Sequence, residues 1–143
     1  MSPSTPRILV VDDNESLVRI IEGVLRNEGF KVLTAFDGID GLEKAIREMP
    51  DLVILDIEMP RMNGYEVCRR LQRSEETARI PVLMLSVKGQ VDTKANIDGR
   101  TMDMRVRERN RGFEVGAIEF ISKPVKARAL VEQVKKLLWI DPE

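Results

Sequence analysis

Short runs of consecutive apolar residues recur along the chain, and each run ends in polar residues. The clearest is Leu52–Leu55, which follows Pro50-Asp51 and leads directly into Asp56. A run of this length between turn residues is typical of a strand buried on both faces. Three further runs have the same character, and a fourth is more polar, as expected at a sheet edge. The three apolar runs cover residues 8–11, 81–86 and 117–122, and the polar run covers residues 31–35.

Between these runs, apolar residues recur at the spacing that gives a helix one buried face. The first predicted helix begins after Asp13 or Asn14 as its cap and ends at Gly29. A second begins after the turn at Asp37-Gly38, a third begins near Gly64, and the last covers about residues 126–139. The expected buried positions are, helix by helix, Leu17, Ile20, Ile21, Val24 and Leu25; Leu42, Ala45, Ile46 and Met49; Val67, Cys68 and Leu71; and Leu130, Val131, Val134, Leu137 and Leu138.

Strand and helix alternate along the whole chain. This order predicts an α/β protein with a doubly wound five-stranded parallel sheet, helices on both faces and right-handed crossovers. A length of 143 residues suits one domain with a substantial core. We expect residues 1–6 to be a flexible N-terminal tail, residues 7–140 to be the domain, and residues 141–143 to be a tail or the start of a linker.

Composition narrows the classes of function. The chain is 43% hydrophobic and 33% charged, and its net charge of -1 gives no field that favours nucleic acid or an anionic membrane. No apolar run is long enough to span a bilayer and no signal-peptide pattern is visible, so we expect a cytoplasmic protein. The chain has no histidine, which removes histidine-based acid/base chemistry, and its single cysteine, Cys68, excludes an internal disulfide.

Four of the five predicted strands end in a potentially reactive group. Asp12 and Asp13 follow the first strand, Asp56 ends the third, Ser86 ends the fourth, and Lys123 follows the fifth. In a parallel sheet these ends lie at one edge, where doubly wound folds bind their ligands. Each acidic residue has a plainer explanation, because aspartate also caps helices. The convergence of all of them at one edge favours a functional site.

The residue types at this edge indicate a metal and a phosphoryl group. Two carboxylates about 4 Å apart repel each other by about 4 kcal/mol at an effective dielectric constant near 20. Three therefore need a counter-charge, and oxygen ligands without histidine or cysteine suit Mg²⁺. A carboxylate, a hydroxyl and an ammonium beside Mg²⁺ can hold a phosphoryl group, and a carboxylate can itself be the nucleophile that forms an acyl phosphate.

Several sequence landmarks occur together in this chain. They are the run Ile8–Asn14, then Asp56 with Met59–Gly64, then Ser86, and finally Gly116-Ala117 leading to Phe120–Pro124. In this combination, which spans nearly the whole chain, the protein resembles the receiver domains of two-component response regulators. The resemblance implies a flavodoxin-like fold with strand order 2-1-3-4-5, the order of a chemotaxis member of the family.

The resemblance also implies roles for the acidic residues. Asp56 would accept a phosphoryl group from the phosphohistidine of a histidine kinase or a histidine phosphotransfer protein, giving an aspartyl phosphate in a phosphorelay. The side chains of Asp13 and Asp56 and the backbone carbonyl of Glu58 would bind Mg²⁺, or Mn²⁺ in its place. Asp12 would hold the metal through water.

Further residues would sense the phosphoryl group. By the same resemblance, Lys123 would pair with its oxygens beside a cis peptide to Pro124, Ser86 would hydrogen-bond to it, and Phe120 would respond as a rotameric switch. The result would be a shift between two conformations, read by an output protein or domain on the face of the fourth helix, fifth strand and fifth helix. A phosphorylation-linked dimer is one form this output could take. Such a domain is not an enzyme, because it catalyses only its own phosphoryl transfer and dephosphorylation.

The segment between Ser86 and Gly116 is longer than the family usually needs, with the extra residues at about 88–105. An extended fourth helix and a loop beside the site both remain open, although Gly99 argues against one uninterrupted helix. A partner surface and a tolerated insertion are equally compatible with it, since loop length costs little stability. Four arginines follow that would spread around a helix, so we interpret them as a solvated face and not as nucleic-acid contacts; they are Arg105, Arg107, Arg109 and Arg111.

Three other classes of function compete with the phosphorylation switch. A pseudo-receiver, an interaction module that needs no phosphate, is kept open by the insertion and by Val87, which is bulkier than the residue usual at that position and could narrow the route to the site. A phosphohydrolase usually has two aspartates one residue apart after the first strand, whereas Asp12 and Asp13 are adjacent. A dinucleotide-binding domain would need a glycine-rich turn there. The sequence leaves open whether the chain acts alone or within a longer protein.

Glu58 and Lys88 occupy the two positions that flank the site in the family. We predict that they pair across its mouth and hinder the water that would hydrolyse the aspartyl phosphate. Lys88→Ala, which removes the ammonium with its methylene chain, should therefore shorten the lifetime of the phosphorylated protein, measured by its loss of the phosphoryl group in mass spectra. An unchanged lifetime would contradict the pair.

Overall fold

The structure, a computed structural model, describes residues 5–87 and 118–138. Five parallel strands form one sheet in the order β2-β1-β3-β4-β5, which confirms the predicted doubly wound topology. The more polar β2 lies at one edge, as expected. The strands are β1 (Arg7–Val11), β2 (Lys31–Ala35), β3 (Leu52–Asp56), β4 (Val82–Ser86) and β5 (Ile118–Ser122).

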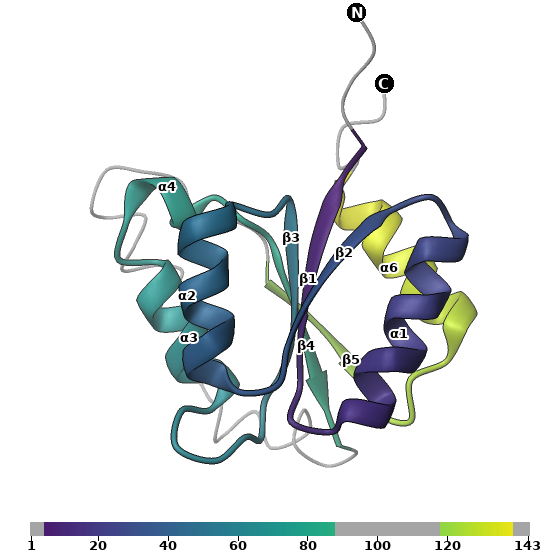
Figure 1. Cartoon of the computed structure of the whole chain (residues 1–143), viewed down its shortest axis with the longest axis horizontal. Helices are drawn as coiled ribbons and strands as arrows, with labels where there is room; N and C mark the ends of the chain where they lie inside the picture. Colours follow the sequence, from purple (N-terminus) through teal and green to yellow (C-terminus); the bar gives the residue numbers. More distant parts are fainter. Residues whose placement is uncertain (1–4, 88–117, 139–143) are drawn as a thin grey trace, which may run out of the picture.

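Helices cover both faces of the sheet (Figure 1). On one face lie α2 (Gly38–Glu48), α3 (Gly64–Leu71) and the short α4 (Glu75–Ala78); on the other lie α1 (Glu15–Asn27) and α6 (Ala127–Leu138). The helix expected between β4 and β5, the insertion at about 88–105, Lys88 and the four arginines fall outside the described residues.

Each central strand contributes to two cores, one on each face. In β1, Leu9 and Val11 pack in the core beneath α2 and α3, whereas Ile8 and Val10 pack in the core beneath α1 and α6. All four side chains are fully buried. Because alternate residues point to opposite faces and both faces are covered, the strand reads as an unbroken apolar run.

Two of the polar residues near the strand ends are helix caps. Asn14 caps α1 by accepting a hydrogen bond from the Leu17 backbone N–H at 3.1 Å. Asn63 caps α3 by accepting one from the Glu66 backbone N–H at 2.9 Å. The cap of α1 is thus Asn14 and not Asp13, and Asp56 does not cap α3. Capping therefore explains neither aspartate.

Three apolar residues predicted to be buried are exposed instead. Ile20 in α1 is 62% exposed, and Ile46 and Met49 in and after α2 are 57% and 41% exposed. In α2 the inner face is made by small residues, and a Cβ atom at Gly41 would stand only 2.8 Å from the side chain of Val11. Because the helix packs closely on β1 through small residues, the larger Ile46 and Met49 lie away from the sheet and are exposed. A count of apolar positions does not identify this face, because glycine carries no hydrophobic signal.

The sequence pattern did not predict α4. Its four residues are too few to show a helical period, and its position is fixed by a tertiary contact. The buried hydroxyl of Thr77 donates a hydrogen bond to the Leu71 carbonyl at 2.5 Å, which folds the turn against the end of α3.

Adjacent isoleucines in α1 provide a test of the corrected helix face. Ile21 is 1% exposed and Ile20 is 62% exposed. Ile21→Ala should lower the free energy of unfolding by about 2–5 kcal/mol, because it leaves a cavity in the core. Ile20→Ala, the matched control, should change it by less than about 1 kcal/mol in urea denaturation. Equal losses for the two variants would contradict this orientation of α1.

Candidate functional site

Acidic side chains from two neighbouring strands meet at the carboxyl edge of the sheet. Carboxylate oxygens of Asp12, Asp13 and Asp56 all lie within 4.8 Å of one another. Asp56 ends β3, and the two other aspartates directly follow β1, its hydrogen-bonded neighbour in the sheet. The predicted convergence of these groups is therefore present.

Lys123, which directly follows the edge strand β5, brings a positive charge to the same point. Its Nζ lies 3.0 Å from Asp56 Oδ1 and 3.3 Å from Asp12 Oδ2. The backbone fixes this position, because the Lys123 N–H donates a hydrogen bond of 2.7 Å to the carbonyl of Ser86 at the end of β4. The peptide bond between Lys123 and Pro124 is cis, as the sequence motif implied.

The loop after Asp56 is folded tightly against its own strand. The Ile57 N–H continues the ladder by donating to the Leu85 carbonyl at 3.1 Å, and the Gly64 N–H closes the loop by donating to the Ile57 carbonyl at 2.9 Å. A Cβ atom at Gly64 would overlap the carbonyl oxygen of Asp56. Glycine at this position therefore allows α3 to begin directly against the residue that carries the central carboxylate.

Burial and the positive charge of Lys123 have opposite effects on the pKa of Asp56. The residue is only 4% exposed, and burial raises the pKa of its carboxyl from 3.8 to about 6. The hydrogen bond with Lys123 lowers the pKa, while the negative charges of Asp12 and Asp13 raise it. The carboxyl group is thus ionised at neutral pH but held in an unfavourable environment that a further cation would relieve.

The same cluster raises the pKa of Lys123. Burial alone would lower it, but the hydrogen bond with Asp56 and the charges of Asp12 and Asp56 outweigh burial. The pKa of Asp56 rises because its loss of hydration outweighs the effect of Lys123, whereas the pKa of Lys123 rises because two carboxylates lie beside it. Lys123 therefore stays a full positive charge beside the carboxylates.

Two buried oxygens in this region retain hydrogen-bonding capacity. Asp12 Oδ1 accepts a hydrogen bond from the Asn14 backbone N–H at 3.0 Å. Asp12 Oδ2 and Ser86 Oγ are buried, and neither has a hydrogen-bond partner within residues 5–87 and 118–138. Asp12 Oδ2 has only the ion pair with Lys123 Nζ at 3.3 Å among the described residues, and buried oxygens without a well-aligned hydrogen bond are costly, so both atoms are suited to a ligand.

The remaining predicted residues lie on β4 and β5 or within two residues after β3 and β4. Ser86 is fully buried at the end of β4, and Phe120 is partly buried on β5 against the core beneath α2 and α3. Glu58 is exposed on the loop after β3, and Val87 is 45% exposed just after Ser86. The pairing predicted between Glu58 and Lys88 stays a prediction, because Lys88 lies outside the described residues.

The oxygen donors fit a divalent cation. Asp12, Asp13 and Asp56 offer hard carboxylate ligands at mutual distances that one ion can bridge, and one of the carboxylate oxygens lacks a hydrogen bond from the described part of the chain. Such a donor set, free of histidine and cysteine, suits Mg²⁺ or Mn²⁺. The three aspartates could thus hold a metal ion beside Lys123.

Comparison with known proteins agrees with this geometry. The family model of the response regulator receiver domain matches residues 8–135. Over 133 residues the chain is 36% identical to the DNA-binding dual master transcriptional regulator RpaA of Synechocystis sp., covering 93% of this chain and 49% of that protein. Over 131 residues it is 39% identical to response regulator PleD of Caulobacter vibrioides, covering 92% of this chain and 26% of that protein. The structure of chemotaxis protein CheY4 from Vibrio cholerae matches with a TM-score of 0.76 at 27% identity, over 94% of this chain and 100% of that one.

The chain belongs to the response regulator receiver domain family of two-component signalling. It spans about half the length of one curated relative and about a quarter of the other. Receiver domains are signalling domains that interact with histidine kinases and output domains, and the acidic cluster is consistent with the phosphorylation site of such a domain. No helix in the described part of the chain is both long and apolar enough to cross a membrane.

The raised pKa of Asp56 predicts a pH-dependent effect on stability. Because the folded state holds this proton more tightly than the unfolded state, ionised Asp56 destabilises the fold above pH 6 and has no such effect below pH 4. In EDTA, Asp56→Asn should therefore be more stable than wild type by up to about 3 kcal/mol at pH 7.5, and the difference should shrink towards pH 4. Urea denaturation at several pH values measures it.

Asp51→Asn is the matched control, since it changes a carboxylate at the other end of β3. Asp51 is exposed and its Oδ2 accepts a hydrogen bond from the Arg7 backbone N–H at 2.8 Å, which an asparagine oxygen can also accept, so this variant should not gain stability. A stability gain in Asp56→Asn that does not vary with pH would contradict the burial of an ionised carboxyl group.

Proposed function

We propose that the chain is a phosphorylation switch in which Asp56 accepts a phosphoryl group from the phosphohistidine of a histidine kinase or a histidine phosphotransfer protein. The observation that supports this most strongly is the position of Asp56, a buried carboxylate held between two other carboxylates and the ammonium of Lys123. Neither helix capping nor core packing accounts for such a group. The family's chemistry does, because it requires a carboxylate nucleophile beside cations.

In the transfer step, an Asp56 carboxylate oxygen forms a bond to phosphorus as the phosphorus–nitrogen bond to the donor imidazole breaks. The imidazole nitrogen keeps the bonding electron pair. Asp56 is suited to attack because its pKa of about 6 leaves it ionised at neutral pH. Lys123, 3.0 Å from the attacking carboxylate, would stay close to the charge that develops on the phosphoryl oxygens.

The metal belongs to the proposal as a ligand of this chain. The side chains of Asp13 and Asp56 and the backbone carbonyl of Glu58 would hold Mg²⁺ or Mn²⁺, with Asp12 acting through water. When bound, the ion supplies positive charge that lowers the repulsion between the carboxylates and the incoming phosphoryl group. Asp12 Oδ2 supports this assignment, because it is buried and makes no hydrogen bond within the described residues, although it pairs with Lys123 Nζ at 3.3 Å.

Output would follow from Ser86 and Phe120. The buried Ser86 hydroxyl has no hydrogen-bond partner in the described part of the chain, so it can turn to bond a phosphoryl oxygen. Phe120 is partly buried on β5, and its rearrangement would alter the surface formed by β5, α6 and the helix expected between β4 and β5. An output protein or domain in the cytoplasm would bind one form of this surface better than the other, through a phosphorylation-linked dimer or a separate partner. We infer that the domain covers residues 7–140.

The proposal predicts covalent labelling of one residue. Incubated with phosphoramidate and Mg²⁺, the wild-type protein should gain one phosphoryl group by intact-protein mass spectrometry, because the donor replaces the kinase. Asp56→Asn should gain none, since an amide is a poor nucleophile, and wild type in EDTA should gain none. Asp51→Asn, the same change at the start of β3, should be labelled as wild type is.

Two results would contradict the switch. Labelling of Asp56→Asn would place the acceptor elsewhere. No labelling of wild type by small donors or by a cognate kinase would favour the pseudo-receiver, with the insertion as its working surface.

A further inference from the structure

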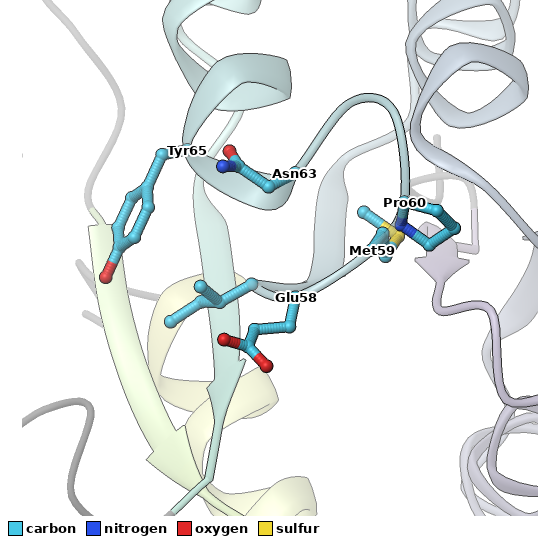
Figure 2. A pocket seen from close by; sticks show the side chains of 6 residues that line it. Glu58, Met59, Pro60, Asn63 and Tyr65 are labelled. Atoms are coloured by element: carbon cyan, nitrogen blue, oxygen red, sulfur yellow. The ribbon is translucent and has the colours of Figure 1, made fainter.

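An open cleft of about 510 Å³ lies beside the site, and it begins one residue after Asp56. In Figure 2, Glu58 lies across the opening from Asn63, and Tyr65 lies across from Met59 and Pro60. Apart from the carbonyl of Glu58, none of these groups takes part in the phosphoryl chemistry proposed above. The lining residues are Ile57, Glu58, Met59, Pro60, Asn63 and Tyr65.

The carboxylate of Glu58 gives this cleft its charge. Its side chain is exposed, and no ammonium or guanidinium of the described residues lies within ion-pair distance of it. Glu48 and Glu66, by contrast, each pair with two arginines. The neighbouring aspartate cluster adds further negative charge, so the cleft attracts a cation.

The other groups of the cleft decide which kind of cation fits. Ile57, Met59 and Pro60 supply apolar walls, and Tyr65 supplies an aromatic ring. A bare metal ion needs several oxygen ligands, whereas the lining of this cleft offers one carboxylate among apolar and aromatic side chains. A guanidinium can pair with a carboxylate through two parallel N–H groups, stack on an aromatic ring and lay its methylene stem on apolar surface.

Three other acceptors around the cleft already accept hydrogen bonds. Asn63 Oδ1 accepts from the Glu66 N–H, the Pro60 carbonyl accepts from the Met62 N–H at 2.7 Å, and the Ile57 carbonyl accepts from the Gly64 N–H. Glu58 is therefore the charged acceptor through which a ligand would be held. Its neutral isostere, glutamine, isolates that contribution.

We propose that this cleft binds the guanidinium of an arginine side chain presented by a partner protein. An arginine seated there would hold the partner next to the loop that carries Asp56. The proposal adds a docking contact to the proposed function, but the binding itself does not depend on phosphoryl transfer. It is therefore measured in EDTA without a phosphodonor, and its failure would leave the labelling result untouched.

The test is an NMR titration of the ¹⁵N-labelled protein with N-acetyl-arginine amide. We expect saturable shifts of the backbone amides in residues 57–65, with a millimolar dissociation constant. N-acetyl-citrulline amide, which has the same shape without charge, should bind at least about tenfold more weakly. Glu58→Gln should weaken binding of the arginine derivative about three- to tenfold, and Glu132→Gln on α6 should leave it unchanged.

Several outcomes would overturn the assignment. Equal binding of N-acetyl-lysine amide would show attraction to charge alone and not recognition of a guanidinium. Shifts that are absent, or that persist unchanged in Glu58→Gln, would show that the cleft is not the site. The pair predicted between Glu58 and Lys88 would compete for the same carboxylate, so weaker binding in Lys88→Ala would also contradict the proposal.

Discussion

The repulsion between carboxylates at the carboxyl edge of the sheet is the constraint that the rest of this structure must accommodate. Carboxylate oxygens of Asp12, Asp13 and Asp56 lie within 4.8 Å of one another, and Asp12 and Asp56 are almost completely buried. Lys123 Nζ pairs with two of them, with Asp56 at 3.0 Å and with Asp12 at 3.3 Å. One ammonium cannot balance three carboxylates, and the pKa of Asp56 is raised mainly by burial and further by the charges of Asp12 and Asp13. The site is thus built to receive positive charge, and a metal ion with a phosphoryl group meets that need.

The fold explains how such a costly cluster can be maintained. β1 and β3 are adjacent central strands whose apolar residues fill the cores on both faces, so Asp12 and Asp56 are held by the most buried part of the sheet. Lys123 is tied to β4 through its backbone, and the loop after Asp56 is closed by Gly64. The stability of the two cores offsets the electrostatic strain at their edge, as functional sites commonly require.

Sequence reasoning recovered the features set by strand order and strand ends. Apolar runs ending in Asp12, Asp56 and Ser86 gave the strands, and parallel topology brought their ends together; the order 2-1-3-4-5 came from resemblance to the family. The outward position of Ile46 was missed because the inner face of α2 is made by glycine and alanine. The contact of Lys123 with both Asp12 and Asp56, and the cleft beside Glu58, depend on distances between side chains that no linear pattern contains.

The most direct test of the account is a crystal structure of the protein with Mg²⁺ and beryllofluoride, a mimic of the phosphoryl group. We expect beryllium bound to an Asp56 oxygen, Mg²⁺ bound to the side chains of Asp13 and Asp56, and both Lys123 Nζ and Ser86 Oγ within hydrogen-bond distance of a fluorine. Beryllofluoride bound elsewhere, or a metal held without Asp13 and Asp56, would contradict the claim that these residues form one phosphoryl-accepting site.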